Sequence, residues 1–353
     1  HPKGMQMTGR SAGRPTIRTI SALTGLSTAT VSKALRQSPH VRPETRRLVE
    51  DAARSVGYAA NLHGVQLRTG KTYQIAAIMP APGPDSDEWD GVEYALLLSG
   101  LSRAVEHSRY RIALFPVRDD DEAREVTARI ATNRLADGVV LAGTQPDDAR
   151  VRLLQDAGLP FVTYGTTDLS PPHPFVDTDN AAVIGRSMAR LIAAGHRRVA
   201  LLNPPAHLSY AVTRLESYRA TLVGAGLPFD PALVAQDRLT PAFGRAQVRA
   251  LSALAAPPTA YVCANEAVAL GALSGFAAAG LVHGRDAVIH ASDDLNISAY
   301  FTPPITTFYL PIARPAALLG DHILRAIAGE PAETLQTLLM PDLIVRSDDR
   351  LHP

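Results

Sequence analysis

Short apolar runs alternate with helical patterns from about residue 73 almost to the end of the chain. The runs favour strands at 74–79, 111–117, 137–142 and 160–164, and again at 175–177, 198–202, 260–264 and 287–290. The segments between them favour helices near 92–107, 122–133, 147–157, 181–194, 214–225, 243–254 and 266–279. Strands and helices that alternate in this way fold into parallel sheets covered by helices. About 280 residues of this pattern predict an α/β body with two lobes.

The composition is that of a soluble globular protein. Of 353 residues, 46% are hydrophobic and 20% are charged, which excludes a disordered or fibrous chain. A single cysteine, Cys263, excludes an intrachain disulfide and a cysteine zinc cluster, and it suits a reducing cytoplasm. No apolar run approaches the ~18 residues of a membrane span. The opening HPKGMQMTGR lacks an apolar secretory core, so we interpret residues 1–15 as a tag remnant and flexible N-terminus, with a native start at Met5 or Met7.

Charge is distributed unevenly along the chain. Residues 1–71 hold twelve basic and three acidic side chains, a net charge of +9, whereas the rest carries −8 of the overall +1. Such a division indicates a head that binds a polyanion, joined to an acidic body. The alternative is a solvated basic surface without a partner.

The basic head has the pattern of a helix-turn-helix. A first helix is predicted from Thr16, with apolar residues at helical spacing until Gly25 ends it; these are Ile17, Ile20, Ala22 and Leu23. Ser27 can cap a second short helix. Its inward residues are Val31, Ala34 and Leu35, and its outward residues are Thr28, Ala29, Ser32 and Lys33.

A third helix is predicted over 43–56, with proline in its first turn. Its apolar stripe consists of Leu48, Val49, Ala52 and Val56. Any small three-helix bundle is the alternative. The small side chains and single lysine outside the second helix favour close approach to base edges.

These stretches resemble the DNA-binding head and hinge of the LacI family of bacterial transcription regulators. The matching segments are TIRTISALTGLSTATVSKAL, VRPETRRLVEDAARSVGY and NLHGVQLRTGKT, which runs into QIAAIMP. The resemblance implies that the second helix enters the major groove of DNA, with Thr28, Ala29 and Lys33 facing bases. It also implies a hinge that folds when two subunits meet on the operator, with Leu67 as an apolar wedge in the minor groove. The full implied DNA-binding set is Thr16, Arg18, Ser27, Thr28, Ala29, Thr30, Lys33, Asn61, Leu67 and Arg68.

The head departs from the family pattern at two places. Gly64 and Val65 stand where the family often has alanine and arginine or glutamine, and the glycine weakens the hinge helix by about 1 kcal/mol. Arg42 replaces the usual serine cap of the third helix.

The resemblance continues through VDTDN, AAGHRRVALLN, ANEAVALGAL, SDDL, PPITT and LIVRS. It implies a periplasmic-binding-protein-like core of two lobes hinged around an effector cleft. The expected organisation is a helix-turn-helix domain at 16–60, a hinge at 61–72, a two-lobed effector-binding and dimerisation core at 73–347 and a tail at 348–353.

Open parallel sheets bind ligands beyond the carboxyl ends of their strands, and polar residues gather there. Asn265 and Glu266 follow one strand, Asp293 and Asp294 follow another, and Arg214 is expected to begin a helix after a polar loop. By resemblance, Arg214, Asn265 and Asp293 match residues that hydrogen-bond the effector in sugar-responsive members. The alternatives are a helix cap for Asp293 and a surface ion pair for Arg214.

Two aromatic residues, Trp89 and Tyr210, complete the predicted effector-binding set. Trp89 stands among five acids in APGPDSDEWDGVEY, where it suits a sugar or a cation, or else anchors the start of a helix. Gly165 stands where the family often has an acid after the fourth strand, so one polar contact is missing.

Catalytic motifs are absent from the sequence: it contains no HExxH, GxSxG or GxGxxG. We therefore expect no enzyme, no metal and no cofactor. The predicted function is a sequence-specific, ligand-responsive regulator, a repressor that a sugar or sugar derivative releases from a palindromic operator. The alternatives are a regulator that needs a purine-like corepressor, and a solute-binding protein without DNA function. Only DDRLHP follows Ser347, too little for the extra helix of family tetramers, so the expected assembly is a homodimer.

Overall fold

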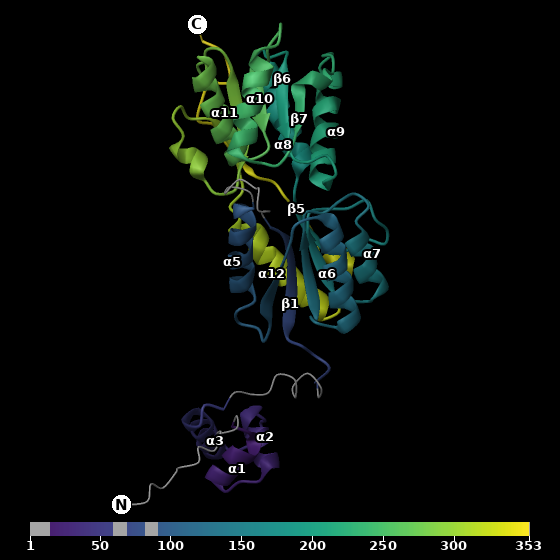
Figure 1. The fold of residues 1–353 in the computed structure, drawn as a ribbon, viewed down its shortest axis with the longest axis vertical. Helices are drawn as coiled ribbons and strands as arrows, with labels where there is room; N and C mark the ends of the chain where they lie inside the picture. The colour runs from purple at the N-terminus through teal and green to yellow at the C-terminus, as the bar shows by residue number, and fades with distance from the viewer. Residues whose placement is uncertain (1–14, 59–68, 82–90, 353) are drawn as a thin grey trace, which may run out of the picture. The chain divides into compact units, whose positions relative to one another are not determined.

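The computed structural model describes residues 15–58, 69–81 and 91–352 (Figure 1). The chain divides into two compact units, the first ending at Lys71 and the second beginning at Thr72. Among the described residues, no helix combines the length and apolar character needed to cross a membrane.

The first unit contains the predicted helix-turn-helix and third helix. These are α1 (Ile17–Thr24), α2 (Thr28–Leu35) and α3 (Pro43–Ser55). Ile20, Val31 and Val49, one from each helix, are completely buried against each other. Two leucines assigned to the apolar stripes, Leu23 and Leu48, are instead 58% and 50% exposed. The core of so small a bundle is filled by one or two residues of each helix, so the edges of both stripes face solvent.

Part of the second unit is a lobe with a parallel sheet, here called the N-lobe. Its strand order is β11 (Gln336–Leu339), β5 (Phe175–Thr178), β4 (Phe161–Tyr164), β3 (Gly138–Ala142), β1 (Gln74–Pro80) and β2 (Arg111–Val117). Helices α5 (Val92–Ala104) and α12 (Ala313–Ile327) cover one face, and α6 (Asp120–Asn133) and α7 (Ala149–Asp156) cover the other. Successive residues of β1 serve opposite faces: Ile75 packs with Leu97 and Leu319, and Ala76 with Ile130.

The other lobe, the C-lobe, repeats the same plan. Its strand order is β12 (Asp342–Ile344), β10 (Thr306–Tyr309), β9 (Val288–Asp293), β8 (Ala260–Cys263), β6 (Val199–Asn203) and β7 (Val234–Gln236), and only β12 is antiparallel to its neighbour. Helices α8 (Asn180–Ala193) and α9 (Ser209–Gly224) cover one face, and α10 (Pro241–Ser252) and α11 (Glu266–Ala279) cover the other. The predicted α/β fold with two parallel-sheet lobes is confirmed.

Within the described residues, the chain crosses between the lobes after β5, after β10 and after β11. Figure 1 shows the consequence, because the late helix α12 lies among the early elements of the N-lobe. The sequence pattern places 175–177 with the second set of strands, whereas β5 pairs with β4 and β11 in the N-lobe. The elements β7, β10, β11 and α12 were not predicted, and α9 begins five residues before Arg214 rather than at it.

The segment expected to be a short tail is anchored to the C-lobe. Asp349 is 6% exposed, and its carboxylate hydrogen-bonds His290 Nε2 at 2.9 Å and pairs with Arg190. His290 Nδ1 in turn lies 2.9 Å from Ser187 Oγ. Ser187, His290 and Asp349 thus form a serine–histidine–aspartate chain, but the serine and histidine are each 1% exposed. Its role is to hold the C-terminal segment in place.

Candidate effector cleft and DNA-reading helix

The structure exposes part of the helix predicted to read DNA. Thr28, Ala29 and Lys33 lie on the solvent-facing side of α2. Ser27 Oγ accepts a hydrogen bond from the backbone N–H of Thr30 at 3.1 Å, so this hydroxyl caps the helix as predicted. Thr30 is half-buried beside it, and its hydroxyl lies 2.9 Å from Ser27 Oγ.

Two further members of the predicted DNA-binding set lie at the start of α1. Thr16 is its N-cap and forms a capping box with Thr19, while Arg18 is exposed. Arg42, the N-terminal flank of α3, makes no side-chain cap, in keeping with the loss of serine there. Asn61, Leu67, Arg68 and Trp89 lie outside the described residues.

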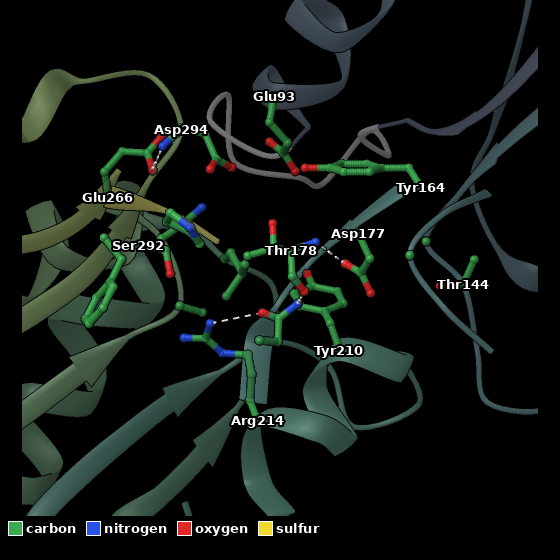
Figure 2. A pocket seen from close by; sticks show the side chains of 18 of the residues that line it. Glu93, Thr144, Tyr164, Asp177, Thr178, Tyr210, Arg214, Glu266, Ser292 and Asp294 are labelled. Atoms are coloured by element: carbon green, nitrogen blue, oxygen red, sulfur yellow. Dashed lines mark hydrogen bonds between the residues drawn. The ribbon is translucent and has the colours of Figure 1, made fainter. Parts of the chain in front are cut away.

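A cavity of about 120 Å³ lies between the lobes, where the carboxyl ends of the two sheets face each other (Figure 2). The N-lobe contributes the residues that follow β3, β4 and β5, and the C-lobe contributes those that follow β8 and β9 together with α9. Among the described residues, four with aromatic rings line the cavity: Tyr94, Tyr164, Tyr210 and Phe308. This is the position that parallel sheets predict for a ligand.

Arg214 supplies a buried cation to this cavity. Only 2% of it is exposed, because it lies on the buried face of α9 with Ala211 and Tyr218. Its Nε donates to Asn203 Oδ1 at 3.2 Å and its Nη1 to Asn180 Oδ1 at 3.3 Å, while the buried Nη2 has no hydrogen-bond partner. Burial lowers its pKa to about 10, so it remains charged at neutral pH. The alternative of a surface ion pair is wrong, and the unpaired Nη2 is a donor available to a ligand.

Carboxyl groups of the C-lobe lie at the other end of the cavity. Burial, and then the charge of Asp294, raise the pKa of Glu266 to about 8. Burial, and then the charges of Glu93 and Asp293, raise the pKa of Asp294 to about 7. Figure 2 shows Glu266 and Asp294 together on the C-lobe side, and the Asp294 backbone N–H donates to Glu266 Oε2 at 3.3 Å. Near neutral pH this end can both donate and accept hydrogen bonds.

Of the predicted effector contacts Asn265 and Asp293, only Asn265 lines the cavity. Asn265 lines the cavity and also caps α11, where its Oδ1 accepts from the Val268 N–H at 2.9 Å; the amide NH₂ is therefore what it can offer a ligand. Asp293 is completely buried but is not a lining residue, and Asp294 takes that place. Both carboxylate oxygens of Asp293 have no hydrogen-bond partner, so the predicted helix-cap alternative is also wrong.

The N-lobe wall is shaped by the close approach of the Gly165 backbone to the side chain of Thr144. Gly165, with φ +113°, lies so near Thr144 that a Cβ at this position would be 2.3 Å from Thr144 Oγ1. An acid therefore cannot replace this glycine without moving Thr144. The Thr144 carbonyl also accepts from the backbone N–H of Ser209 at 2.9 Å, a hydrogen bond that links the two lobes.

Several lining residues were missed by the sequence reasoning. They are Glu93, Tyr94, Tyr164, Asp177, Thr178, Asn180, Ser292 and Phe308. Asp177, Thr178 and Asn180 belong to the quoted motif VDTDN, and Glu93 and Tyr94 to the quoted stretch APGPDSDEWDGVEY, so these stretches of sequence were a usable signal. Of the predicted effector set, the structure brings Tyr210, Arg214 and Asn265 together.

A helix-turn-helix unit joined to a two-lobed unit with a polar cleft defines a DNA-binding regulator with a ligand-binding domain. Residues 16–61 match the family model described as bacterial regulatory proteins of the lacI family, and residues 72–322 match that of periplasmic binding proteins and the sugar binding domain of the LacI family. The chain belongs to the LacI family of transcriptional regulators.

Relatives match almost the whole chain. The HTH-type transcriptional regulator AglR of Rhizobium meliloti (strain 1021) is 34% identical over 338 residues, which cover 94% of this chain and 93% of AglR. The HTH-type transcriptional regulator CelR of Thermobifida fusca is 30% identical over 342 residues, which cover 94% of this chain and 98% of CelR.

Solved structures agree with the fold. The transcriptional regulator CelR in complex with cellobiose is 28% identical, with a TM-score of 0.69 over 94% of this chain and 99% of that one. The lac repressor dimer bound to operator and the anti-inducer ONPF shares the fold at 19% identity, with a TM-score of 0.82 over 96% of this chain and 99% of that one.

Proposed function

We propose that this regulator is a non-enzymatic repressor of the cytoplasm that binds a palindromic operator as a homodimer and is released from it by a sugar effector. The observation that carries the proposal is the buried Arg214, whose Nη2 has no partner and which lines the cavity between the lobes. A desolvated donor of this kind costs stability unless a ligand satisfies it.

The chemistry of the cavity favours a polyhydroxylated ligand. Arg214 and Asn265 offer donors, Glu266 and Asp294 offer oxygens that donate when protonated and accept when ionised, and the aromatic rings offer flat apolar faces. Sugar hydroxyls both donate and accept, and a pyranose ring has an apolar face. The cellobiose bound by the related CelR supports this class of effector.

On the DNA side, the exposed residues of α2 support base contacts by Thr28, Ala29 and Lys33. Leu67 remains the proposed wedge in the minor groove. Asn61 and Arg68 of the same segment are proposed to contact the DNA backbone. Thr16 and Ser27 cap the N-termini of α1 and α2. Their proposed contacts are to DNA phosphates, which bind readily at the N-termini of helices. Arg18 adds an exposed charge for the same purpose.

Effector binding needs to change operator affinity by only about 1 to 3 kcal/mol. The lobes are joined by the chain segments that cross between them and by the Thr144–Ser209 hydrogen bond. A ligand in the cleft contacts both lobes and can therefore shift the angle between them. We propose that this shift separates the two hinge segments of the dimer and thereby weakens operator binding.

The test is retention of sheared genomic DNA from the source organism by the purified full chain at about 0.15 M salt, followed by sequencing of what is retained. We expect a palindrome to be enriched, and retention to fall when sugars are added. Retention without any common sequence contradicts specific DNA reading, and ligand that strengthens retention identifies a corepressor instead.

Two variants locate the reading surface in the same assay. Lys33→Ala is expected to weaken retention of the palindrome and alter its base preference, and Leu67→Ala to weaken specific binding more than nonspecific binding. If Lys33→Ala leaves the base preference unchanged, Lys33 is not part of the reading surface. If Leu67→Ala weakens specific and nonspecific DNA binding equally, Leu67 is not a wedge.

A further inference from the structure

A second cavity, of about 310 Å³, borders the cavity that contains Arg214. We call the second the outer cavity and the first, of about 120 Å³, the inner cavity. Their linings have residues of both lobes in common, namely Glu93, Tyr94, Gly143, Tyr210 and Leu239. The two cavities are therefore neighbouring parts of one cleft.

The strand order gives the direction of this cleft. The inner cavity lies at the ends of β3, β4 and β5, next to the chain crossings, whereas the outer cavity lies at the ends of β1 and β2. In the C-lobe the inner cavity meets β8 and β9, and the outer cavity meets the loops after β6 and β7. The strand β3, which ends at the inner cavity, is the direct neighbour of β1, which ends at the outer one, and neighbouring strands are only ~4.8 Å apart, so the two cavities are adjacent along the edge of the sheet.

The inner cavity is small for a ligand that would occupy it alone. Its volume of about 120 Å³ is below the ~300 Å³ at which ordinary ligand pockets begin. The outer cavity continues it, because five of the described residues line both cavities. A ligand that fills this cleft is therefore longer than the inner cavity.

The outer cavity has the mixed lining that a second sugar ring requires. Asp120 at the start of α6 and Arg238 in the C-lobe supply an acceptor and donors, and His207 is exposed in the loop before α9. Leu208 adds an apolar surface beside them. Arg150 also lines this cavity, but it is pinned by Asp148 and by the carbonyls of residues 142 and 143, so it shapes the wall.

We propose that the effector is an oligosaccharide of at least two rings, with one ring in the inner cavity beside Arg214 and the next in the outer cavity beside Leu208 and His207. The inference rests on the proposed sugar effector. Because the outer cavity is lined by both lobes, the second ring contributes to the closure of the cleft as well as to affinity.

The experiment is calorimetric titration of the full chain with glucose and galactose, compared with cellobiose, maltose and lactose. We expect the tightest disaccharide to bind at least 10-fold more tightly than either monosaccharide. Leu208→Trp fills part of the outer cavity from a residue absent from the inner lining, so it should abolish most of that advantage and leave monosaccharide affinity unchanged. Leu208→Ala, the matched control at the same position, leaves the outer cavity open and removes only one apolar contact, so it should keep most of the preference for the disaccharide.

Each other result has a distinct meaning. A monosaccharide that binds as tightly as every disaccharide overturns the two-ring effector and leaves the sugar-responsive repressor intact. A Leu208→Trp variant that retains its melting temperature and loses affinity equally for both lengths also overturns it. If none of the five sugars binds, both the two-ring inference and the proposed sugar effector are overturned.

Discussion

The two walls of the cleft are built on sheets of the same strand order, yet they hold polar groups differently. On the C-lobe wall, Arg214 keeps an unpartnered nitrogen, and Asp293 behind the wall keeps two unpartnered oxygens. On the N-lobe wall, the carboxylate of Asp177 accepts from the N–H and hydroxyl of Thr166 and from the N–H of Thr178. Among the described residues at the cleft, the buried polar groups without a hydrogen-bond partner are thus on the C-lobe, whereas the carboxylate of Asp177 on the N-lobe wall is satisfied by its own neighbours.

The largest expected effect is on the C-lobe wall, from Arg214→Lys. Lysine keeps a positive charge but loses the fork that reaches Asn203, Asn180 and a ligand at once, so affinity for the tightest disaccharide should fall about 100-fold, or about 2.7 kcal/mol. Calorimetry measures the loss, and operator retention without sugar should stay normal. Undiminished affinity at an unchanged melting temperature contradicts the contrast between the walls.

Asp293→Asn should have the next largest effect on the ligand. Asp293 does not line the cavity, but its charge helps to raise the pKa of Asp294, which does, so we expect the response of DNA binding to sugar to weaken by about 10-fold. The melting temperature should rise at the same time, because an unpartnered buried carboxylate is replaced by a neutral amide. A normal sugar response assigns the ligand to other residues.

On the N-lobe wall, Gly165→Asp should act on stability. The backbone at φ +113° is strained for any side chain and the new Cβ meets Thr144 Oγ1, so we expect a loss of about 2 kcal/mol in the free energy of unfolding. The double variant with Thr144→Ala removes the clash and should recover part of this loss. Denaturant unfolding measures both, and a single variant as stable as the parent shows that this wall is adaptable.

The smallest expected effect is a pH-dependent gain in stability from Glu266→Gln. The pKa of Glu266 is raised from 4.5 to about 8, so the folded protein binds a proton more tightly than the unfolded chain, and the resulting stability is complete below about pH 4.5 and lost as pH rises through 8. Glutamine has no such loss. The variant should therefore melt a few degrees higher than the parent at pH 9, with the gain shrinking towards pH 5, and a gain independent of pH contradicts this origin.

Local patterns were enough to predict the helix-turn-helix and the two-lobed α/β fold, because the periodicity of apolar residues is a property of neighbouring positions. They were not enough to assign β5 to its sheet. The sequence of a four-residue strand does not show which strands it pairs with. The place of β5 in the sheet is fixed by its pairing with β11, which lies some 160 residues later in the chain. The same non-local packing places α12 in the N-lobe.

Three of the five predicted effector-binding residues line the inner cavity, and they were predictable for a similar reason. Tyr210, Arg214 and Asn265 follow from motif and strand end, but the choice between Asp293 and Asp294 depends on the register of β9. That strand was predicted to end at His290 and continues to Asp293, so side-chain alternation puts Ser292 and Asp294 on the cavity side and Asp293 behind them. For the N-lobe, a motif such as VDTDN was the only signal, since no local pattern shows which strand ends of the two sheets meet.

The late return of α12 and β11 to the N-lobe has a consequence for protein synthesis. The first 178 residues contain five strands of that lobe, but its core also needs Leu319 and Ile323, and its sheet needs β11. The C-lobe core, by contrast, lies between residues 180 and 310 in one stretch. On the ribosome, the C-lobe can complete its core while the N-lobe, made first, still waits for the segment that closes it.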